Sequence, residues 1–342
     1  MRAMILAAGL GTRMQPLTHY RAKPALPIRG RPLISLLLEF LSRQDCHEVM
    51  INLHHRSDTI RKAVAADHPA DLDIHWSQEP VPLGTGGGIR RAADFLAAEE
   101  ACVVLASDML LDVPLKALFD RHLASGRQAT LLLREDPRTA IFGSIGVNSA
   151  GFVTRVGQRI IQCDRRSPLE GGQQETAHGL FTGVRFFSSE AFRDWPDNSK
   201  PTPMPSTMPV PQSEFAFEDL RDWLVPNIES RELKVGSEIL AAEACVWEPV
   251  GTLEEYLEVN LHPPALPTLG GAVESWTGAV EVRGAKSNVI VSTEASLPHN
   301  ARLERAVVWD GEIVPSNFSG ASGVYAGGLF HEAAKKDLGA KP

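Results

Sequence analysis

The sequence predicts an α/β fold, in which a Rossmann-like and mostly parallel sheet is flanked by helices, extended by antiparallel strands and followed by a short C-terminal β domain. Short apolar runs alternate with amphipathic stretches up to residue 134, which is the pattern of strands joined by crossover helices. From about residue 141 the apolar runs become shorter and glycines separate them. Residues 272–330 hold short β-like runs and no convincing helix.

Strands and helices are expected to alternate in the first half of the chain. The five expected strands are Met4–Ala8, Glu48–Leu53, Asp73–Ser77, Ala101–Ala106 and Ala129–Arg134. The four expected helices are Pro32–Arg43, Ser57–Ala66, Thr85–Ala98 and Pro114–Ser125. Ser57 or Asp58 is the expected N-cap of the second helix. In such a sheet, ligands bind beyond the C-terminal ends of the strands.

The pattern changes in the second half of the chain. Antiparallel strands are expected at Ser144–Asn148, Phe152–Val156 and Leu180–Phe187. Six prolines between residues 196 and 211 exclude a helix or central strand and predict a surface loop. Further elements are expected at Phe217–Val225, a helix, and at Val246–Asn260, a strand leading through Gly251 into a helix. A linker at 262–271 predicts two domains, 1–262 and 263–342.

Composition excludes several classes of partner. The net charge is −8 and aromatic residues make up 6% of the chain, so we expect neither a general polyanion site nor a stacking platform for nucleic acid. No apolar stretch approaches ~18 residues, and Ala3–Ala8 is too short for a signal peptide. The expectation is a cytoplasmic protein with no membrane contact. The four cysteines are far apart and are expected to be buried thiols.

The strongest local pattern is residues 5–24, ILAAGLGTRMQPLTHYRAKP. Small residues after a buried strand let a phosphate approach the backbone, and successive N–H groups in such a turn bind anions. Arg13 can bind two phosphate oxygens and Lys23 adds a point charge. Met14 stands where a dinucleotide fingerprint needs glycine, and no Gly-Lys-Ser/Thr follows. The pattern therefore predicts a phosphate site, although an ordinary tight turn with solvated cations would also fit its glycines.

Asp108 follows the apolar run Ala101–Ala106 closely. A carboxylate at the C-terminal end of a strand is well placed to hold Mg²⁺ beside a phosphate, although it can also cap a helix or turn. His54 and His55 are adjacent, and neighbours on extended chain face opposite ways, so a shared metal ion is not expected.

The run from Gly9 to Pro24 resembles the signature of the sugar-1-phosphate nucleotidyltransferase (NDP-sugar pyrophosphorylase) family, and is most similar to its mannose-1-phosphate guanylyltransferase branch. The resemblance covers about residues 1–262. It implies that an NTP and a sugar 1-phosphate give an NDP-sugar and pyrophosphate, with Mg²⁺ as cofactor. GTP and mannose 1-phosphate are the substrates it favours. A uridylyl- or guanylyltransferase for another sugar phosphate, such as a heptose or N-acetylmuramic acid, is the alternative.

The resemblance also implies roles for individual residues. The catalytic residues would be Arg13, Lys23 and Asp108, and Asp108 would bind the metal. The nucleotide-binding residues would be Ala8, Gly9, Gly11, Thr12, Glu79, Gly84 and Thr85. The sugar-binding residues would be Gly143, Thr182 and Gly183. Glu79 is the expected base reader, because a carboxylate can accept from two adjacent guanine donors; the alternative is a solvated loop acid.

Two departures from the family pattern weaken the implied catalysis. The family's Glu-Lys-Pro contact to the sugar phosphate is missing near Ile161–Arg166. Pro249 stands where the Trp-x-Asp-Val-Gly-Thr motif has a second metal carboxylate. Glu248 is the neighbouring candidate ligand, but it would need a bulge to turn toward the metal. These departures keep another class open, a nucleotide-sugar-binding regulatory subunit with little catalysis.

Residues 272–330 resemble a short left-handed β-helix, an appendage of several enzymes in this family. The resemblance depends on the runs 288–291, 301–303 and 306–309, and on Gly311. Two or three coils are too few for an acyltransferase helix. We therefore expect a structural role for this part of the chain, or a role in forming a homo-oligomer.

Overall fold

Most of the chain is described in the computed structural model, over residues 1–162, 170–193, 195, 216–230, 232–270, 278–284 and 287–333. The expected proline-rich loop at 196–211, residues 163–166 of the missing-motif stretch and Cys163 fall outside these ranges. Cys46, Cys102 and Cys245 are buried free thiols, as expected. None of the helices in these ranges combines the length and the apolar character needed to cross a bilayer.

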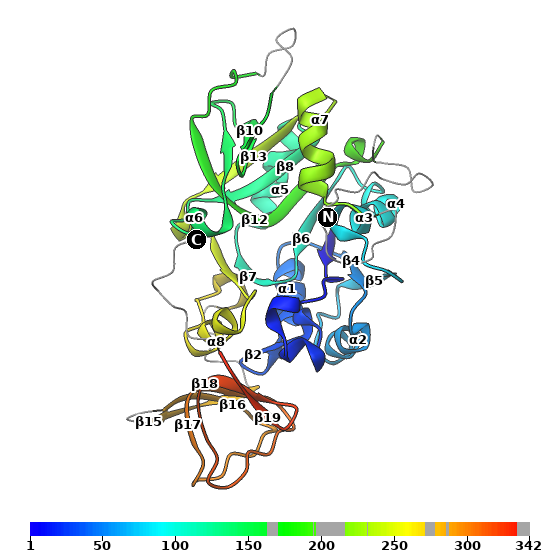
Figure 1. Ribbon diagram of the computed structural model, residues 1–342. Helices are drawn as coiled ribbons and strands as arrows, with labels where there is room; N and C mark the ends of the chain where they lie inside the picture. The colour runs from blue at the N-terminus through cyan, green and yellow to red at the C-terminus, as the bar shows by residue number, and fades with distance from the viewer. Residues whose placement is uncertain are drawn as a thin grey trace.

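A ten-stranded sheet forms the centre of the molecule (Figure 1). β1 (Arg2–Leu6) pairs in parallel with β4 (Glu48–Leu53) on one side and with β6 (Ala101–Ala106) on the other. β5 (Asp73–Gln78) extends this parallel set beyond β4. The parallel pairing confirms the α/β class predicted from these apolar runs.

The rest of the sheet is mixed and is joined to the parallel strands through β12 (Ala177–Ser188). β12 is antiparallel to β6 and to β8 (Ala129–Arg134), and β8 is parallel to β13 (Val235–Leu240). Three short antiparallel strands extend β12: β9 (Ile145–Val147), β10 (Val153–Val156) and β11 (Arg159–Ile160). The predicted antiparallel extension is therefore present.

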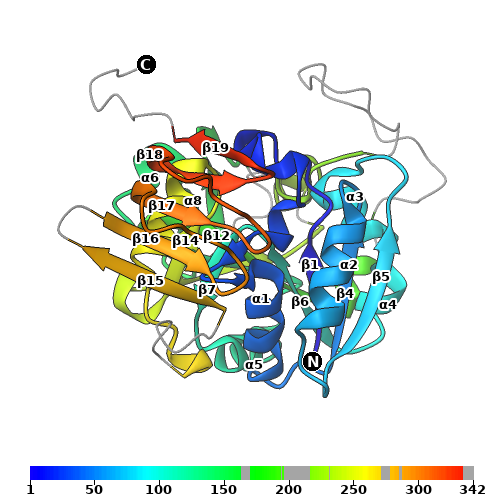
Figure 2. The same ribbon diagram turned by 90° about the horizontal axis from the view of Figure 1, so that it is seen from below.

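Helices cover both faces of the sheet (Figures 1 and 2). One layer contains α1 (Leu33–Ser42), α2 (Ser57–Ala66) and α5 (Leu115–Ala124). The other layer contains α3 (Gly84–Arg91), α4 (Ala93–Leu96) and α7 (Val225–Ser230). Ala3 and Ile5 of β1 join the core under the first layer, and Met4 joins the core under the second. Because β1 is buried on both faces, its residues after Arg2 form an unbroken apolar run.

α2 begins differently from the sequence-based expectation. Arg56 precedes it in a left-handed conformation with φ of 49°, and neither Ser57 nor Asp58 caps the helix, so that prediction was wrong. Arg56 is held by tertiary contact, because its Nη2 donates to the carbonyl of Tyr20 at 2.8 Å. Thr59 Oγ1 donates to the Arg56 carbonyl at 2.7 Å and fixes the turn from the helix side.

Two other expected helices are interrupted. The helix expected at Thr85–Ala98 is divided at Ala92 into α3 and α4. The helix expected at Phe217–Val225 begins as a π-helix at Asp219–Leu224 and continues into α7. π-helical turns commonly occur at functional sites, and this one lies beside the cleft described below.

A separate two-stranded sheet leads into the last helix. It consists of β7 (Met109–Asp112) and β14 (Val246–Pro249), which are antiparallel. α8 (Leu253–Leu261) follows, with Thr252 as its N-cap; Thr252 Oγ1 accepts from the backbone N–H of Glu255 at 3.2 Å. The predicted run from strand through glycine into helix is confirmed.

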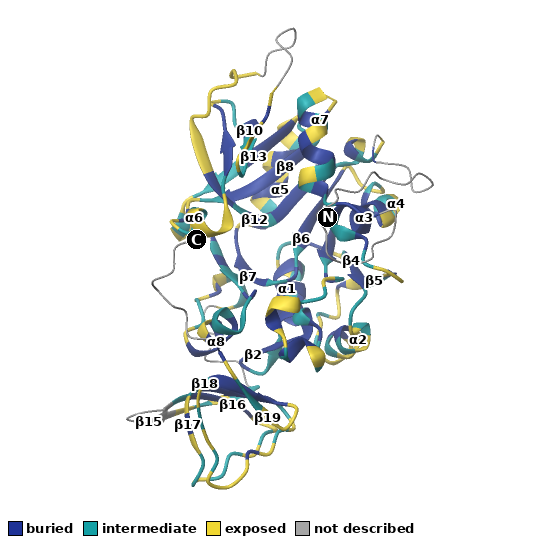
Figure 3. Cartoon of the chain, in the orientation of Figure 1, coloured by how far each residue is buried: buried dark blue, intermediate teal, exposed yellow. Residues whose placement is uncertain are grey.

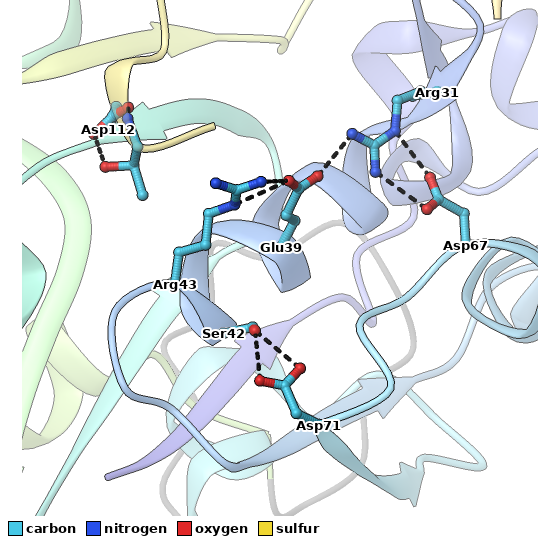
Figure 4. Close-up of polar contacts among 8 residues, drawn as sticks. Arg31, Glu39, Ser42, Arg43, Asp67, Asp71 and Asp112 are labelled. Atoms are coloured by element: carbon cyan, nitrogen blue, oxygen red, sulfur yellow. Dashed lines mark hydrogen bonds and ion pairs between the residues drawn. The ribbon is translucent and has the colours of Figure 1, made fainter. Parts of the chain in front are cut away.

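Polar contacts join α1 to its surroundings (Figure 4). Arg31 donates to Glu39 of α1 at 2.8 Å and to both carboxylate oxygens of Asp67, after α2, at 2.9 and 3.1 Å.

Asp112 of β7 accepts from the backbone and the hydroxyl of Thr268 at 2.7 and 2.6 Å. The expected linker at 262–271 is thus attached to β7 by hydrogen bonds.

The C-terminal sheet lies against α8 and β2 (Pro27–Ile28) at one end of the molecule (Figures 1 and 3). Its strands are β15 (Ala279–Gly284), β16 (Ser287–Ser292), β17 (Arg302–Val308), β18 (Ser319–Ala326) and β19 (Leu329–Glu332). β16, β17 and β18 are parallel, and the two outer strands are antiparallel to their neighbours. This pairing shows a C-terminal sheet, while the left-handed β-helix stays a prediction.

Candidate active site

A cleft of about 620 Å³ opens beyond the C-terminal ends of β1, β4 and β6. This is where ligands bind in open parallel sheets. The residues of the expected site that line it are Ala8, Gly9, Gly11, Thr12, Arg13, Lys23, Glu79, Gly84, Thr85, Asp108 and Gly183. Segments distant in the sequence therefore meet here, as the family resemblance implied.

The glycine loop after β1 is shaped by close contacts. Ala7 donates its backbone N–H to Oδ1 of Asn52 at 2.7 Å, which fixes the point where β1 ends. Gly11 has φ of +63°, and a Cβ there would lie 2.7 Å from Cγ2 of Thr18, so only glycine fits. In the part of the chain that the structure describes, the N–H groups of Gly9, Leu10 and Gly11 meet no protein acceptor. They remain available to an anion.

Lys23 and Asp108 form an ion pair in the cleft. Nζ of Lys23 lies 2.9 Å from Oδ2 of Asp108, and the Asp108 side chain is 42% exposed. The main chain of Asp108 is held in turn, because its carbonyl accepts from Val250 N–H at 2.8 Å. Ser107, where the family usually has glycine, donates its hydroxyl to the Leu6 carbonyl at 2.6 Å and ties β6 to β1. The carboxylate therefore projects from a rigid strand end.

Arg13 is exposed at the mouth of the cleft. Within the described ranges it makes no hydrogen bond or ion pair, so its guanidinium is available to a ligand. A Cβ on Gly251 would lie 3.4 Å from Nη2 of Arg13, which shows how closely the guanidinium lies against this backbone.

Glu79 is almost fully buried, with 1% of its surface exposed. Its Oε1 accepts from Nδ2 of Asn52 at 2.7 Å, and its Oε2 accepts from the backbone N–H of Leu83 at 3.1 Å. Burial raises the pKa of Glu79, and the hydrogen bonds from Asn52 and Leu83 act in the opposite direction. These contacts position the loop before α3, while reading of the base by Glu79 stays a prediction.

Sequence reasoning missed a polar network on the other wall of the cleft. The Thr85 hydroxyl lies 2.6 Å from both Glu218 Oε2 and Asp219 Oδ1. Asp219 also pairs with Arg185, whose Nε lies 2.7 Å from Oδ2, and both side chains are only 4% exposed. An arginine inside the apolar strand run 180–187 was the available signal, because a buried arginine requires a partner.

The expected sugar-binding residues are not all at this cleft. Gly183 lines it, whereas the Thr182 hydroxyl donates to the Leu132 carbonyl at 2.9 Å inside the sheet. Thr182 is buried and does not line the cleft. Gly143 ends α6 (Thr139–Phe142) with φ of +80° and does not line the cleft. The structure therefore removes Thr182 and Gly143 from the wall of this site.

Glu248, the neighbouring candidate metal ligand, does not line the Asp108 cleft. β14 pairs with β7 in regular register through Glu248, so no bulge turns the side chain. Its Oε2 accepts from Nη1 of Arg138 at 2.9 Å, and it lines a second hollow of about 370 Å³. No group of three metal-ligating side chains occurs in the described ranges.

One further sequence expectation concerns the neighbouring histidines. His54 Nδ1 contacts the Glu79 carbonyl at 2.9 Å, and His55 Nε2 contacts the Thr18 carbonyl at 2.9 Å. The two rings thus turn to different partners, as predicted, and both contacts stabilise loops at the rim of the cleft.

Comparison with known proteins identifies the domain that supplies the glycine loop, Lys23 and Asp108 to this cleft. The family model described as nucleotidyl transferase matches residues 2–158. A UTP–glucose-1-phosphate uridylyltransferase of Synechocystis is 29% identical over 200 residues, covering 56% of this chain and 50% of that protein. The mannose-1-phosphate guanylyltransferase catalytic subunit beta of Drosophila melanogaster is 30% identical over 154 residues, covering 44% and 42%. The chain spans about half the length of these curated relatives, or less.

Further similarities agree with this one. A D-glycero-alpha-D-manno-heptose 1-phosphate guanylyltransferase of Aneurinibacillus thermoaerophilus is 26% identical over 211 residues, covering 56% of this chain and 91% of that protein. The crystal structure of HddC from Yersinia pseudotuberculosis superposes with a TM-score of 0.57 at 21% identity, over 75% of this chain and 96% of HddC, which shows a shared fold. The chain thus contains a nucleotidyl transferase domain over residues 2–158 and is similar to sugar-1-phosphate nucleotidyltransferases.

Proposed function

We propose that this chain transfers a nucleotidyl group from an NTP to a sugar 1-phosphate, forming an NDP-sugar and releasing pyrophosphate. The observation that carries the proposal is the convergence of the glycine loop, Arg13, Lys23 and Asp108 in one cleft. The match of residues 2–158 to the nucleotidyl transferase family model supports the same reaction class.

The chemistry needs positioning and charge neutralisation more than proton transfer. A phosphate oxygen of the sugar attacks the α-phosphorus in line with the leaving pyrophosphate, and this nucleophile is already an anion. The N–H groups of Gly9 and Gly11 and the charges of Arg13 and Lys23 would neutralise the pyrophosphate as it departs. Lys23 would exchange its contact with Asp108 for a substrate phosphate.

The cleft fits a Mg²⁺ ion that is held by one protein carboxylate. Asp108 offers a half-exposed carboxylate on a rigid strand end, and Mg²⁺ is commonly bound by one or two carboxylates together with substrate phosphates. When bound, the ion would supply positive charge beside the α-phosphate.

The specific proposal is GTP with mannose 1-phosphate. It is supported by the similarity to the Drosophila guanylyltransferase and by the carboxylate of Glu79 beside the loop that begins α3. Relatives named for heptose and glucose phosphates support the alternatives, a uridylyl- or guanylyltransferase for another sugar 1-phosphate.

A panel of NTPs and sugar 1-phosphates, scored by pyrophosphate release, tests both levels of this proposal. Fastest release with GTP and mannose 1-phosphate is the expected result. Faster release with another pair would reject the specific substrates and keep the reaction class.

A regulatory subunit that binds NDP-sugars is the second candidate function. Its support is Pro249 in place of a metal-binding aspartate, together with the commitment of Glu248 to Arg138. Binding of NDP-sugars without pyrophosphate release from any pair of substrates would favour this candidate over the enzyme.

A further inference from the structure

The segment that carries Arg13 and Lys23 is packed from outside by the C-terminal sheet. Met14 and Leu17 of this segment are fully buried in a core that also contains Val307 and Val324 of β17 and β18. The far face of the phosphate-binding segment therefore depends on strands near the other end of the chain.

Arg21 makes the polar part of this contact. Its Nη2 lies 2.7 Å from Oδ2 of Asp310, and its guanidinium lies over the ring of Trp309, 4.9 Å from the centroid. Trp309 is itself fixed, since its Nε1 donates to the Tyr256 hydroxyl at 2.9 Å. Tyr256 in turn donates to the Pro27 carbonyl at 2.6 Å, so this network links Arg21 to β2.

Tyr20 holds the neighbouring position. A Cβ on Gly327 would lie 2.2 Å from Cε1 of Tyr20, so the ring lies directly on the backbone of the turn between β18 and β19. The His331 ring lies 5.7 Å away between centroids. Two successive residues, Tyr20 and Arg21, are thus fixed by the C-terminal sheet, and only Ala22 separates them from Lys23.

Arg21 itself does not line the cleft, so it is not placed to touch a substrate. We propose that Arg21 is a positioning residue: held by Asp310 and Trp309, it sets the location of Lys23 relative to the phosphates. This inference rests on the proposed function. A displacement of about 1 Å at a reacting group can cost roughly a hundredfold in rate, so contacts behind the segment can control activity.

The test is a double-mutant cycle in the full chain with Asp310→Asn and Lys23→Ala. We expect Asp310→Asn alone to reduce kcat/KM and NTP affinity by about fivefold to tenfold. In the Lys23→Ala background the same change should have little further effect, because the residue that it positions is already absent. Losses that multiply in the double variant, or a single variant equal to the wild type, would overturn the proposal.

Glu254→Gln provides the matched control. Glu254 pairs with Arg305 of β17 at 2.6 Å and joins the same sheet to α8, with 33% exposure against 38% for Asp310. This variant should leave kcat/KM and NTP affinity unchanged. Arg21→Lys, which keeps the charge, should restore part of what Arg21→Ala loses.

Titration of NTP binding separates this inference from the proposed function. If no substrate pair turns over, the reaction class fails, but the cycle can still be measured by NTP affinity. Asp310→Asn should then weaken NTP binding in the protein that retains Lys23 and not in the Lys23→Ala variant. Equal weakening in both would reject the positioning role on its own.

Discussion

Nζ of Lys23 lies 2.9 Å from Oδ2 of Asp108, so the cation expected at the phosphates and the carboxylate expected at the metal neutralise each other in the free protein. An incoming nucleotide must separate this pair. Because each charge is paired with the other, little free energy is lost by keeping both in the cleft until a ligand binds them.

Lys23→Ala and Asp108→Ala should each lower turnover at least tenfold and leave the fold intact. The Lys23 variant would lack a positive charge at the leaving group, and the Asp108 variant would lack the carboxylate that would hold the metal ion. Pyrophosphate release and thermal unfolding measure the two effects. Lys116→Ala, which removes an exposed pair with Asp120 on α5, should change neither. Unchanged turnover in both cleft variants would place the site elsewhere.

Gly11→Ala should weaken NTP binding at least tenfold. The new Cβ would lie 2.7 Å from Cγ2 of Thr18, so the anion-binding turn would have to move. Gly126→Ala is the control, because Gly126 has the same φ of +63° and no neighbour within 4 Å. Both changes carry the left-handed backbone cost of about 1–2 kcal/mol. Only the first should alter binding, measured by calorimetric titration.

Asp219→Ala should destabilise the fold by about 3–5 kcal/mol, since it leaves the Arg185 charge buried without its carboxylate. Asp120→Ala removes an exposed ion pair and should cost less than about 1 kcal/mol. Urea unfolding compares the two. Similar losses of unfolding free energy in both variants would contradict a major contribution of the buried Arg185–Asp219 pair to stability.

His122 makes stability depend on pH. Burial, followed by the charge of Arg127, lowers its pKa to about 4 from an ordinary value of 6.5. Between these values the unfolded chain binds a proton that the folded protein does not, so the free energy of unfolding decreases as pH falls from 6.5 to 4. From pH 7 to pH 5 this loss should be about 2 kcal/mol.

The arrangement around His122 explains this sign. Its Nδ1 contacts the Thr130 hydroxyl at 2.8 Å, and its Nε2 has no partner among the described residues, so a second proton would be buried unpaired. His122→Gln should remove this part of the pH dependence. Urea unfolding of both proteins at pH 7 and pH 5 measures it, and an unchanged slope in the variant would reject the assignment.

Local patterns predicted the elements that depend on local sequence. The apolar runs at Glu48–Leu53 and Ala101–Ala106 became strands with the predicted bounds, because buried parallel strands require such runs. The start of α2 could not be predicted in this way. It depends on a contact between Arg56 and Tyr20, and no pattern within the helix records that partner.

The site residues show the same difference between what local sequence predicts and what depends on distant contacts. The glycine loop, Lys23 and Asp108 could be placed together because each follows or flanks a strand end, where a parallel sheet gathers its ligand contacts. Glu248 does not join them, and its contact with Arg138 could not be predicted locally because Arg138 lies on a different part of the chain. Arg185 and Asp219 were missed for the same reason, since each is explained only by the other.

The core shared by Met14, Leu17, Val307 and Val324 also affects how the chain is made. Synthesis proceeds from the N-terminus, so the apolar side chains of the phosphate-binding segment leave the ribosome long before β17 and β18 exist to cover them. Until then the core that covers them is incomplete, and the nascent chain carries an exposed apolar surface that favours aggregation beside the candidate active site. Folding of the N-terminal half alone therefore cannot cover this segment, which needs β17 and β18 to complete its core.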